Sequence, residues 1–187
     1  MSKFDIHLYT KCVNFAALKH KDQRRKDAEK TPYINHPIGV ASILTNEAFI
    51  EDQNVLMAAL LHDTVEDTNT TFEEIEKEFG TVVRAIVEEV TDDKNLPKLE
   101  RKRLQIVHAP TSSHSAKLVK LADKLYNLRD LERAIPVGWS KSYYDEYYRW
   151  AFLVIDGLRG TNAVLERELD DIFKRRGLLS ESGDQEC

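Results

Sequence analysis

Apolar residues recur along the chain at helical spacing, and few glycines or prolines interrupt them. Apolar side chains at Phe4, Leu8, Phe15 and Leu18 predict a first helix. The run over 55–61 is apolar on every side, so it predicts a helix buried in the centre of a domain. The chain has only 7 glycines and 5 prolines, about half the usual combined share of roughly 12%. This pattern predicts an all-α fold.

Capping residues and prolines predict where other helices begin and end. Pro37 is well placed to open a helix over 38–45. Thr71 with Glu74 matches a capping box that opens another, which Gly80 ends. Further helices are expected over 81–90, 98–108, about 116–131, about 140–158 and 162–176.

Length, charge and cysteine content narrow the class of protein. The 187 residues fit one domain, expected over 1–176 and followed by a mobile tail over 177–187. A net charge of -5 argues against a protein that coats nucleic acid. Cys12 and Cys187 provide neither a disulfide framework nor a zinc thiolate cluster. No secretory signal or membrane span is found, so we expect a cytoplasmic protein without a membrane, nucleic-acid or evident protein partner.

An imidazole and three carboxylates follow the buried helix directly. If the helix continues past residue 61, His62, Asp63, Glu66 and Asp67 fall within an arc of about 140°. Buried carboxylates are costly without cations, a metal ion or solvent, and a metal ion in a water-filled cleft would satisfy all three. A His-Asp pair alone is common by chance, whereas His-Asp-x-x-Glu-Asp is much rarer.

Two other segments carry polar groups that could join this cluster. Pro37 holds His36 at the joint between a loop and a helix. Asp123 lies off the apolar face of its helix and shares a stripe with Lys120 and Asn127, so a carboxylate, an ammonium and an amide could face one ligand. Taken alone, Asp123 is better interpreted as part of an exposed charged face.

The segments that carry these residues resemble a known family. YINHP at 33–37, LHDTVEDT at 61–68 and KLVKLADKLYN at 117–127 resemble the signatures of RelA/SpoT-type HD-domain phosphohydrolases, and 4–176 are similar to the small stand-alone members of animals. The resemblance implies an all-helical HD-domain phosphohydrolase fold with its motif core at about 33–128. It also implies four metal ligands: His36, His62, Asp63 and Asp123.

The resemblance implies a metal and a reaction as well. One Mn²⁺ per chain is expected, and two imidazoles with two carboxylates also suit Fe²⁺ or Zn²⁺. The ion would activate water that hydrolyses guanosine 3′,5′-bis(diphosphate) to GDP and pyrophosphate. Glu66 and Asp67 match the family's catalytic pair and could hold or deprotonate that water.

Two alternatives to this reaction stay open. The same metal site could instead serve an NADPH 2′-phosphatase, which yields NADH and phosphate. Outside enzymes, the chain could be a nucleotide-sensing module, although the intact pair Glu66 and Asp67 argues against a non-catalytic role.

A small nucleotide with four phosphates needs local positive charge. Arg24, with Arg25, could stack on a base and form forked pairs with phosphate. Lys98 and Asn127 resemble the family's nucleotide-binding positions, and Tyr147 aligns with a position expected near the nucleotide.

Other conspicuous residues are given structural interpretations. The basic residues at 101–103 are interpreted as a solvated helix face, and the aromatic stripe within 143–150 as core. His108 and His114 are interpreted as loop or surface histidines rather than ligands of a second metal.

Overall fold

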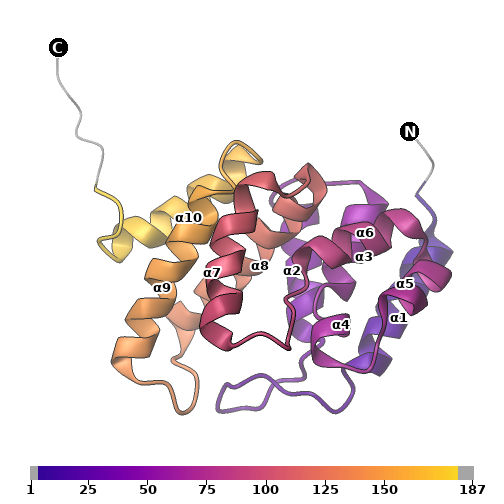
Figure 1. Ribbon diagram of the computed structural model, residues 1–187, viewed down its shortest axis with the longest axis horizontal. Coiled ribbons are helices and arrows are strands. Elements are labelled where there is room, and N and C mark those ends of the chain that lie inside the picture. Colours follow the sequence, from indigo (N-terminus) through magenta and orange to yellow (C-terminus); the bar gives the residue numbers. More distant parts are fainter. Residues whose placement is uncertain (1–3, 181–187) are drawn as a thin grey trace.

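The fold is a bundle of helices. The computed structural model describes residues 4–180, and within this range it contains ten α-helices, one 3₁₀ turn and no strand, which confirms the predicted all-α class. The helices are α1 Ile6–Lys19, α2 Asn35–Asn46, α3 Gln53–Leu61, α4 Thr64–Asp67, α5 Phe72–Phe79, α6 Thr81–Val90, α7 Lys98–His108, α8 His114–Arg133, α9 Lys141–Asp156 and α10 Ala163–Arg175, with the 3₁₀ turn η1 at Ala109–Thr111. Figure 1 shows α1 and α5 at one end of the long axis and α9 and α10 at the other.

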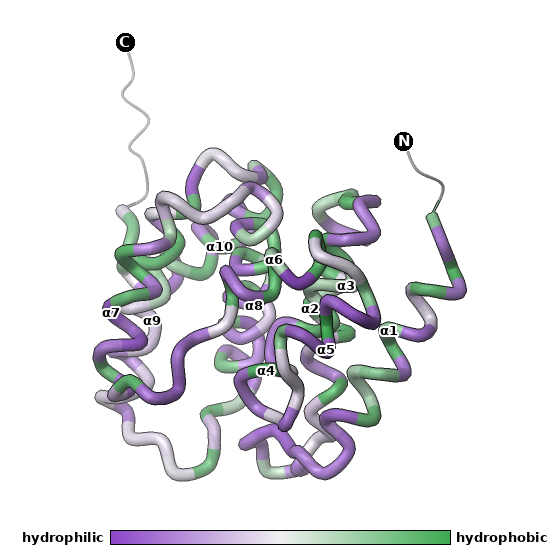
Figure 2. Tube along the Cα trace, turned by 45° about the vertical axis from the view of Figure 1, so that its right-hand side comes forward, coloured by the Kyte–Doolittle hydropathy of each residue, from purple (hydrophilic) through white to green (hydrophobic). Residues whose placement is uncertain are grey.

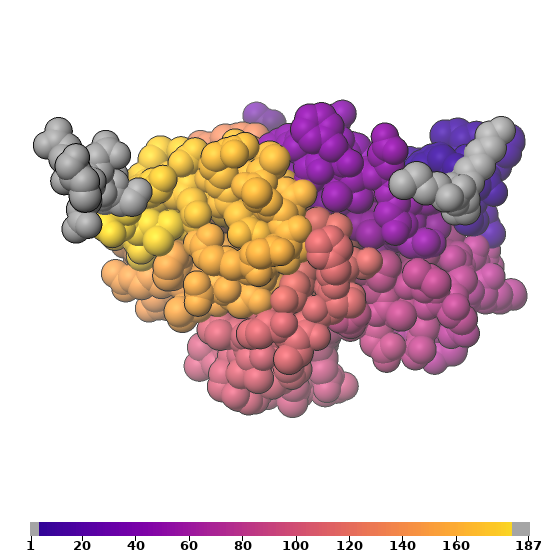
Figure 3. Space-filling model, turned by 90° about the horizontal axis from the view of Figure 1, so that it is seen from above, coloured from indigo at the N-terminus to yellow at the C-terminus, as the bar shows by residue number. Residues whose placement is uncertain are grey.

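The centre of the molecule is α3. Every residue from Val55 to Leu61 is buried, and the helix packs against α1, α2, α6 and α8. This confirms the prediction of a buried central helix. On the outside, α7 has no buried residue and is largely hydrophilic in Figure 2. Figure 3 shows α7 standing out from one side of the molecule.

The predicted helix boundaries are largely confirmed, except that the helix expected over 38–45 begins at Asn35, so Pro37 lies within its first turn. Thr71 accepts a hydrogen bond from the Glu74 amide and Gly80 ends α5 with a positive φ, and α6 and α7 have the predicted bounds. The helix expected over 116–131 begins earlier, at His114, because Ser113 caps it by accepting from the Ala116 amide.

The assumption of one continuous helix through residue 67 is wrong. The central helix ends at Leu61, whose carbonyl accepts a hydrogen bond from the Thr64 hydroxyl at 2.7 Å. A new turn of helix, α4, starts at Thr64. His62 and Asp63 therefore lie at a corner between two helices rather than on the side of one.

Two further expectations concern the C-terminal part. The buried aromatic residues of α9 are Tyr144 and Tyr148. Tyr147 and Trp150 of the predicted stripe pack only partly buried against the core, so that prediction is confirmed in part. Of the expected tail, Leu178 and Leu179 pack partly buried against the core, and 181–187 lie outside the described residues. Within the described residues no helix is both long and apolar enough to cross a bilayer.

Candidate functional site

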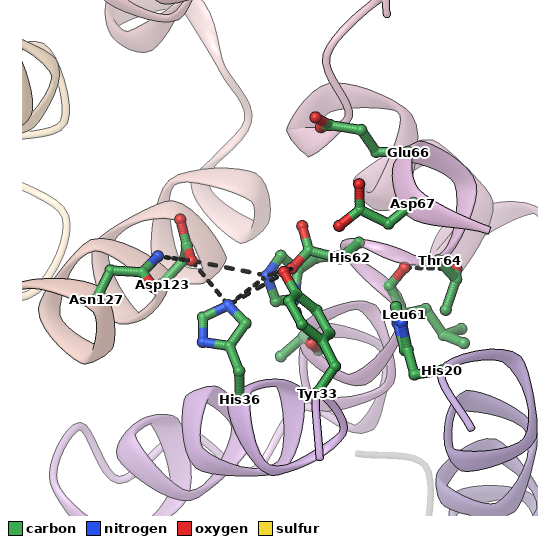
Figure 4. A network of polar contacts seen from close by, with 12 residues as sticks. His20, Tyr33, His36, Leu61, His62, Thr64, Glu66, Asp67, Asp123 and Asn127 are labelled. Carbon is green, nitrogen blue, oxygen red and sulfur yellow. Dashed lines mark hydrogen bonds and ion pairs between the residues drawn. The ribbon is translucent and has the colours of Figure 1, made fainter. Parts of the chain in front are cut away.

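Four side chains from three parts of the chain meet beside α3. His36 comes from the first turn of α2, His62 and Asp63 from the corner after α3, and Asp123 from the middle of α8. The Nε2 atoms of the two histidines are 3.2 Å apart. His62 Nε2 lies 3.0 Å from Asp63 Oδ2, and His36 Nε2 lies 3.2 Å from Asp123 Oδ1. Figure 4 shows the side chains of His36, His62 and Asp123 pointing toward one another.

The close approach of α2 and α8 makes this meeting possible. Gly39 lies one turn after His36, and Tyr126 lies one turn after Asp123. A Cβ at position 39 would overlap the Tyr126 ring, 2.6 Å from Cδ2. Glycine therefore allows the helix that carries His36 to lie directly against the helix that carries Asp123.

The orientation of the histidines fits a metal ion. His62 Nδ1 lies 2.7 Å from the Ala59 carbonyl, and because a carbonyl can only accept, Nδ1 carries the proton and a neutral ring directs its Nε2 lone pair into the site. One ligand atom each from His36, His62 and Asp123 all lie within 4.8 Å of one another. Imidazole nitrogens and carboxylate oxygens without thiolate are a donor set for Mn²⁺, Fe²⁺ or Zn²⁺.

Neighbouring side chains orient the two carboxylates. The Tyr33 hydroxyl donates to Asp63 Oδ2 at 2.7 Å. The Lys124 ammonium donates to Asp123 Oδ2 at 2.8 Å, and the Asn127 amide donates to Oδ1 at 2.7 Å. Such outer contacts fix the direction of ligand oxygens around a metal ion.

The two carboxylates of the cluster favour a positive charge between them and the histidines. Burial lowers the pKa of His36. Burial acts the same way on His62, but Asp63 and Asp123 outweigh it and raise the pKa of His62 well above its ordinary value. Burial would raise the pKa of Asp63, but His62 and His36 outweigh it and lower that pKa. Without a metal ion, a proton on His62 therefore balances the carboxylates, and metal binding would displace it.

A cavity of about 560 Å³ opens over this cluster. Its walls include all four side chains as well as acidic and basic groups from α6, α7 and α8. Among the predicted residues, Glu66 and Asn127 also line it. The cavity is therefore large enough for a small molecule and places it against the cluster.

Glu66 and Asp67 lie in different surroundings. Glu66 accepts from Arg101 Nη1 and from the Asp92 amide, both at 3.2 Å. Burial, followed by the charge of Asp92, raises the pKa of Glu66 to about 7. Asp67 accepts from Gln23 at 2.9 Å and pairs with Lys94, and it faces a neighbouring hollow rather than the cavity itself.

The predicted nucleotide-binding residues are spread around the cavity. Arg25 donates to Asn127 Oδ1 at 3.0 Å and to Asp130 at 2.9 Å, which places it beside the site. The Arg24 guanidinium instead donates to two carbonyls of its own loop. Lys98 lies 4.5 Å above the Tyr143 ring, outside the cavity lining. Tyr147 packs against Trp139 and Trp150, also outside that lining.

Sequence reasoning missed three residues that shape the site. Tyr33 stands in the quoted motif, but only its hydrogen bond to Asp63 shows its role. Lys124 follows Asp123 directly, and adjacent helix residues do not ordinarily face each other. Arg101 is not on a solvated face as interpreted, because it pairs with Glu66 and lines the cavity. Of its basic neighbours, Lys102 is half-buried and Arg103 is exposed.

The chain is similar to proteins of one known family. A family model described as "HD domain" matches residues 12–143. The chain is 67% identical over 174 residues to a Xenopus tropicalis protein named guanosine-3′,5′-bis(diphosphate) 3′-pyrophosphohydrolase MESH1, covering 93% of this chain and 97% of that protein. It is also 67% identical over 166 residues to the human protein of that name, covering 89% and 93%.

A solved structure has the same fold. It is described as a metazoan ortholog of SpoT that hydrolyzes ppGpp, and it superposes with a TM-score of 0.93 at 57% identity, covering 95% of this chain and 100% of that one. The family model spans more than half of the chain, and the relatives are matched over nearly their whole length. The chain therefore belongs to the HD domain family, in company with the MESH1 proteins of animals.

Proposed function

We propose that the chain hydrolyses guanosine 3′,5′-bis(diphosphate) to GDP and pyrophosphate in the cavity above His36, His62, Asp63 and Asp123. The observation that carries the proposal is the convergence of these four side chains at the floor of that cavity. Relatives named for this reaction support the substrate. The enzyme is a phosphohydrolase whose substrate is a small nucleotide. Its two cysteines, which provide no disulfide framework, suit a cytoplasmic location.

We further propose that the four side chains hold one Mn²⁺. Their nitrogen and oxygen donors suit that ion and also Fe²⁺ and Zn²⁺. Bound there, the ion would polarise a phosphate oxygen and make a coordinated water more acidic. Tyr33, Lys124 and Asn127 hold the carboxylates in place for it.

The protein's own groups handle the proton and the charge. Glu66, with its pKa raised to about 7, is suited to accept a proton from the attacking water near neutral pH. The water oxygen bonds to the phosphorus that is attached to the ribose 3′-oxygen. The bond between that phosphorus and the 3′-oxygen breaks. The 3′-oxygen takes up the proton that Glu66 removed from the water, which gives the 3′-hydroxyl of GDP, and the phosphorus leaves as part of pyrophosphate.

In this proposal Arg25 and Asn127, which are hydrogen-bonded to each other beside the site, bind the nucleoside side of the substrate. Asp67 is the second carboxylate of the proposed catalytic pair, although it pairs with Lys94 and faces the neighbouring hollow.

Product analysis tests the proposal. Chelator-stripped protein is given Mn²⁺ with guanosine 3′,5′-bis(diphosphate) or NADPH in parallel, and products are identified by phosphorus NMR. We expect pyrophosphate from the guanosine substrate. Asp63→Asn should lose at least about a hundredfold in rate, which corresponds to about 2.7 kcal/mol of barrier. The matched control Asp171→Asn changes an exposed aspartate on α10 and should behave as wild type.

Two outcomes would reject the assignment. If metal-loaded wild type releases no pyrophosphate, the reaction is not the one proposed. If Asp63→Asn turns over at the wild-type rate, the reaction does not depend on this cluster.

A further inference from the structure

Lys120 is a largely buried ammonium on the wall of the cavity. It lies on α8 and donates to the Ser112 hydroxyl at 2.9 Å. Among the described residues no carboxylate forms an ion pair with it, in contrast to Lys124, which is paired with Asp123. A charge removed from water without a counterion is costly, so Lys120 would be stabilised by an anion that enters the cavity.

The pKa of Lys120 is consistent with the lack of an ion-pair partner within residues 4–180. Burial, reinforced by the charge of Lys124, lowers the pKa of Lys120 to about 8, although the charges of Glu89 and Asp92 oppose the shift. Lys124, in contrast, donates to Asp123 Oδ2 at 2.8 Å. Lys120 is thus the lysine of this pair whose charge the protein leaves uncompensated.

The position of Lys120 along α8 indicates which anion it meets. Residue 120 precedes Asp123 by three positions, a rise of about 4.5 Å on the same side of the helix. Asn127, with Arg25, lies on the opposite side of Asp123 along the helix. A diphosphate whose reacting phosphorus lies at Asp123 and whose nucleoside extends toward Asn127 would direct its outer phosphate toward Lys120.

We propose that the Lys120 ammonium, held by Ser112, binds the outer phosphate of the 3′-diphosphate and makes the site select diphosphate over monophosphate. This inference rests on the proposed function, because it takes the reacting phosphate to lie at the His36, His62, Asp63 and Asp123 cluster. It adds a specificity-determining residue that acts on the leaving pyrophosphate.

Product inhibition tests the selection directly. The inhibition constants of inorganic pyrophosphate and inorganic phosphate are measured at one fixed free Mn²⁺ concentration for wild type, Lys120→Met, Lys120→Arg and Lys117→Met. Lys120→Met should weaken pyrophosphate inhibition about tenfold or more, the effect expected for one lost charged hydrogen bond. Inhibition by phosphate should stay within about twofold, and Lys120→Arg should restore part of the pyrophosphate affinity.

Lys117→Met is the matched control, because Lys117 lies one turn earlier on α8 and does not line the cavity. Pyrophosphate and phosphate should inhibit Lys117→Met with the same constants as wild type. Lys120→Met should also unfold at a temperature no lower than wild type, since it removes an uncompensated buried charge. Unchanged pyrophosphate inhibition in a folded Lys120→Met protein would overturn the inference, as would an equal loss for phosphate and pyrophosphate.

A second measurement separates this inference from the proposed function. If wild type shows no turnover, the proposed function fails, but calorimetric binding of pyrophosphate to wild type and Lys120→Met still compares the two. Tighter binding by wild type would support the role of Lys120, and equal binding would reject it.

Discussion

The fold gives the Glu66 carboxyl group a pKa close to neutral pH. Burial and Asp92 raise its pKa from 4.5 to about 7, while Arg101 Nη1 lies 3.2 Å from Oε1 and favours the charged form. A base with a pKa near the working pH combines a useful unprotonated fraction with sufficient affinity for a proton. Two predictions at the residue scale follow from this environment.

The first concerns turnover. Glu66→Gln keeps the shape and the contact with Arg101 but cannot accept the proton of water. We expect kcat to fall about a hundredfold or more, with KM little changed and metal content equal to wild type. Steady-state kinetics and elemental analysis measure the three quantities. Wild-type kcat in this variant would exclude Glu66 as the base.

The second concerns stability without metal. Because the pKa of Glu66 is raised in the folded state, folded protein binds the proton more tightly than unfolded protein. The stabilisation by that proton is complete below about pH 4.5 and is lost as the pH rises through about 7. Gln is neutral at every pH, so metal-free Glu66→Gln should exceed wild type in unfolding free energy at pH 8, by about 1–2 kcal/mol.

Urea unfolding at pH 5 and pH 8 measures this difference. The gap between the variant and wild type should shrink toward pH 5, and Glu146→Gln, on the exposed side of α9, should show no such pH dependence. A gap that is the same at both pH values would mean that Glu66 is ionised normally.

At the scale of helices, the contact between α2 and α8 decides the distance between His36 and Asp123. Gly39→Ala would place a Cβ against the Tyr126 ring. We expect the two helices to move apart, with a loss of about 1–3 kcal/mol in unfolding free energy and weaker metal binding. Denaturant unfolding and metal titration measure both, with Ser42→Ala on the exposed face of α2 as control.

Relief of the clash gives a sharper test of the same contact. Gly39→Ala combined with Tyr126→Leu should recover part of the lost metal affinity, because the shorter side chain leaves room for the added methyl group. If the double variant binds metal no better than Gly39→Ala, the contact does not control the site.

Helix boundaries were predictable from sequence where a cap decides them locally. Thr71 with Glu74 and the glycine at 80 predicted α5. The corner after α3 was not predictable by periodicity, because the Thr64 hydroxyl that binds the Leu61 carbonyl leaves the hydrophobic pattern unchanged. Polar contacts of this kind compete with the helix without leaving a periodic signal.

At the scale of the whole molecule, the site joins parts of the chain that are far apart in sequence. The motifs carried enough information to predict its polar groups, but not their partners. Arg101 reaches Glu66 from α7, and Lys94 reaches Asp67 from the loop before it. Both contacts depend on how α7 lies across the bundle, which no local pattern in the sequence encodes.

Because the proposed metal ligands come from α2, the α3 corner and α8, metal binding should stabilise the entire fold. A ligand that binds only folded protein at 100 times its dissociation constant adds about 2.7 kcal/mol. We expect Mn²⁺ to raise the unfolding temperature of wild type in calorimetry, and Asp123→Ala to show almost no such rise. A metal-dependent rise of equal size in that variant would place the ion elsewhere.

Titration of Mn²⁺ into chelator-stripped protein, with pyrophosphate release from guanosine 3′,5′-bis(diphosphate) followed at each addition, tests the central claim most directly. We predict that the rate rises with bound metal, levels off at one ion per chain, and stays near zero in His62→Ala at the same Mn²⁺ concentrations. A rate that is independent of added metal, or a His62→Ala protein that follows the wild-type curve, would contradict a hydrolase that works through this cluster.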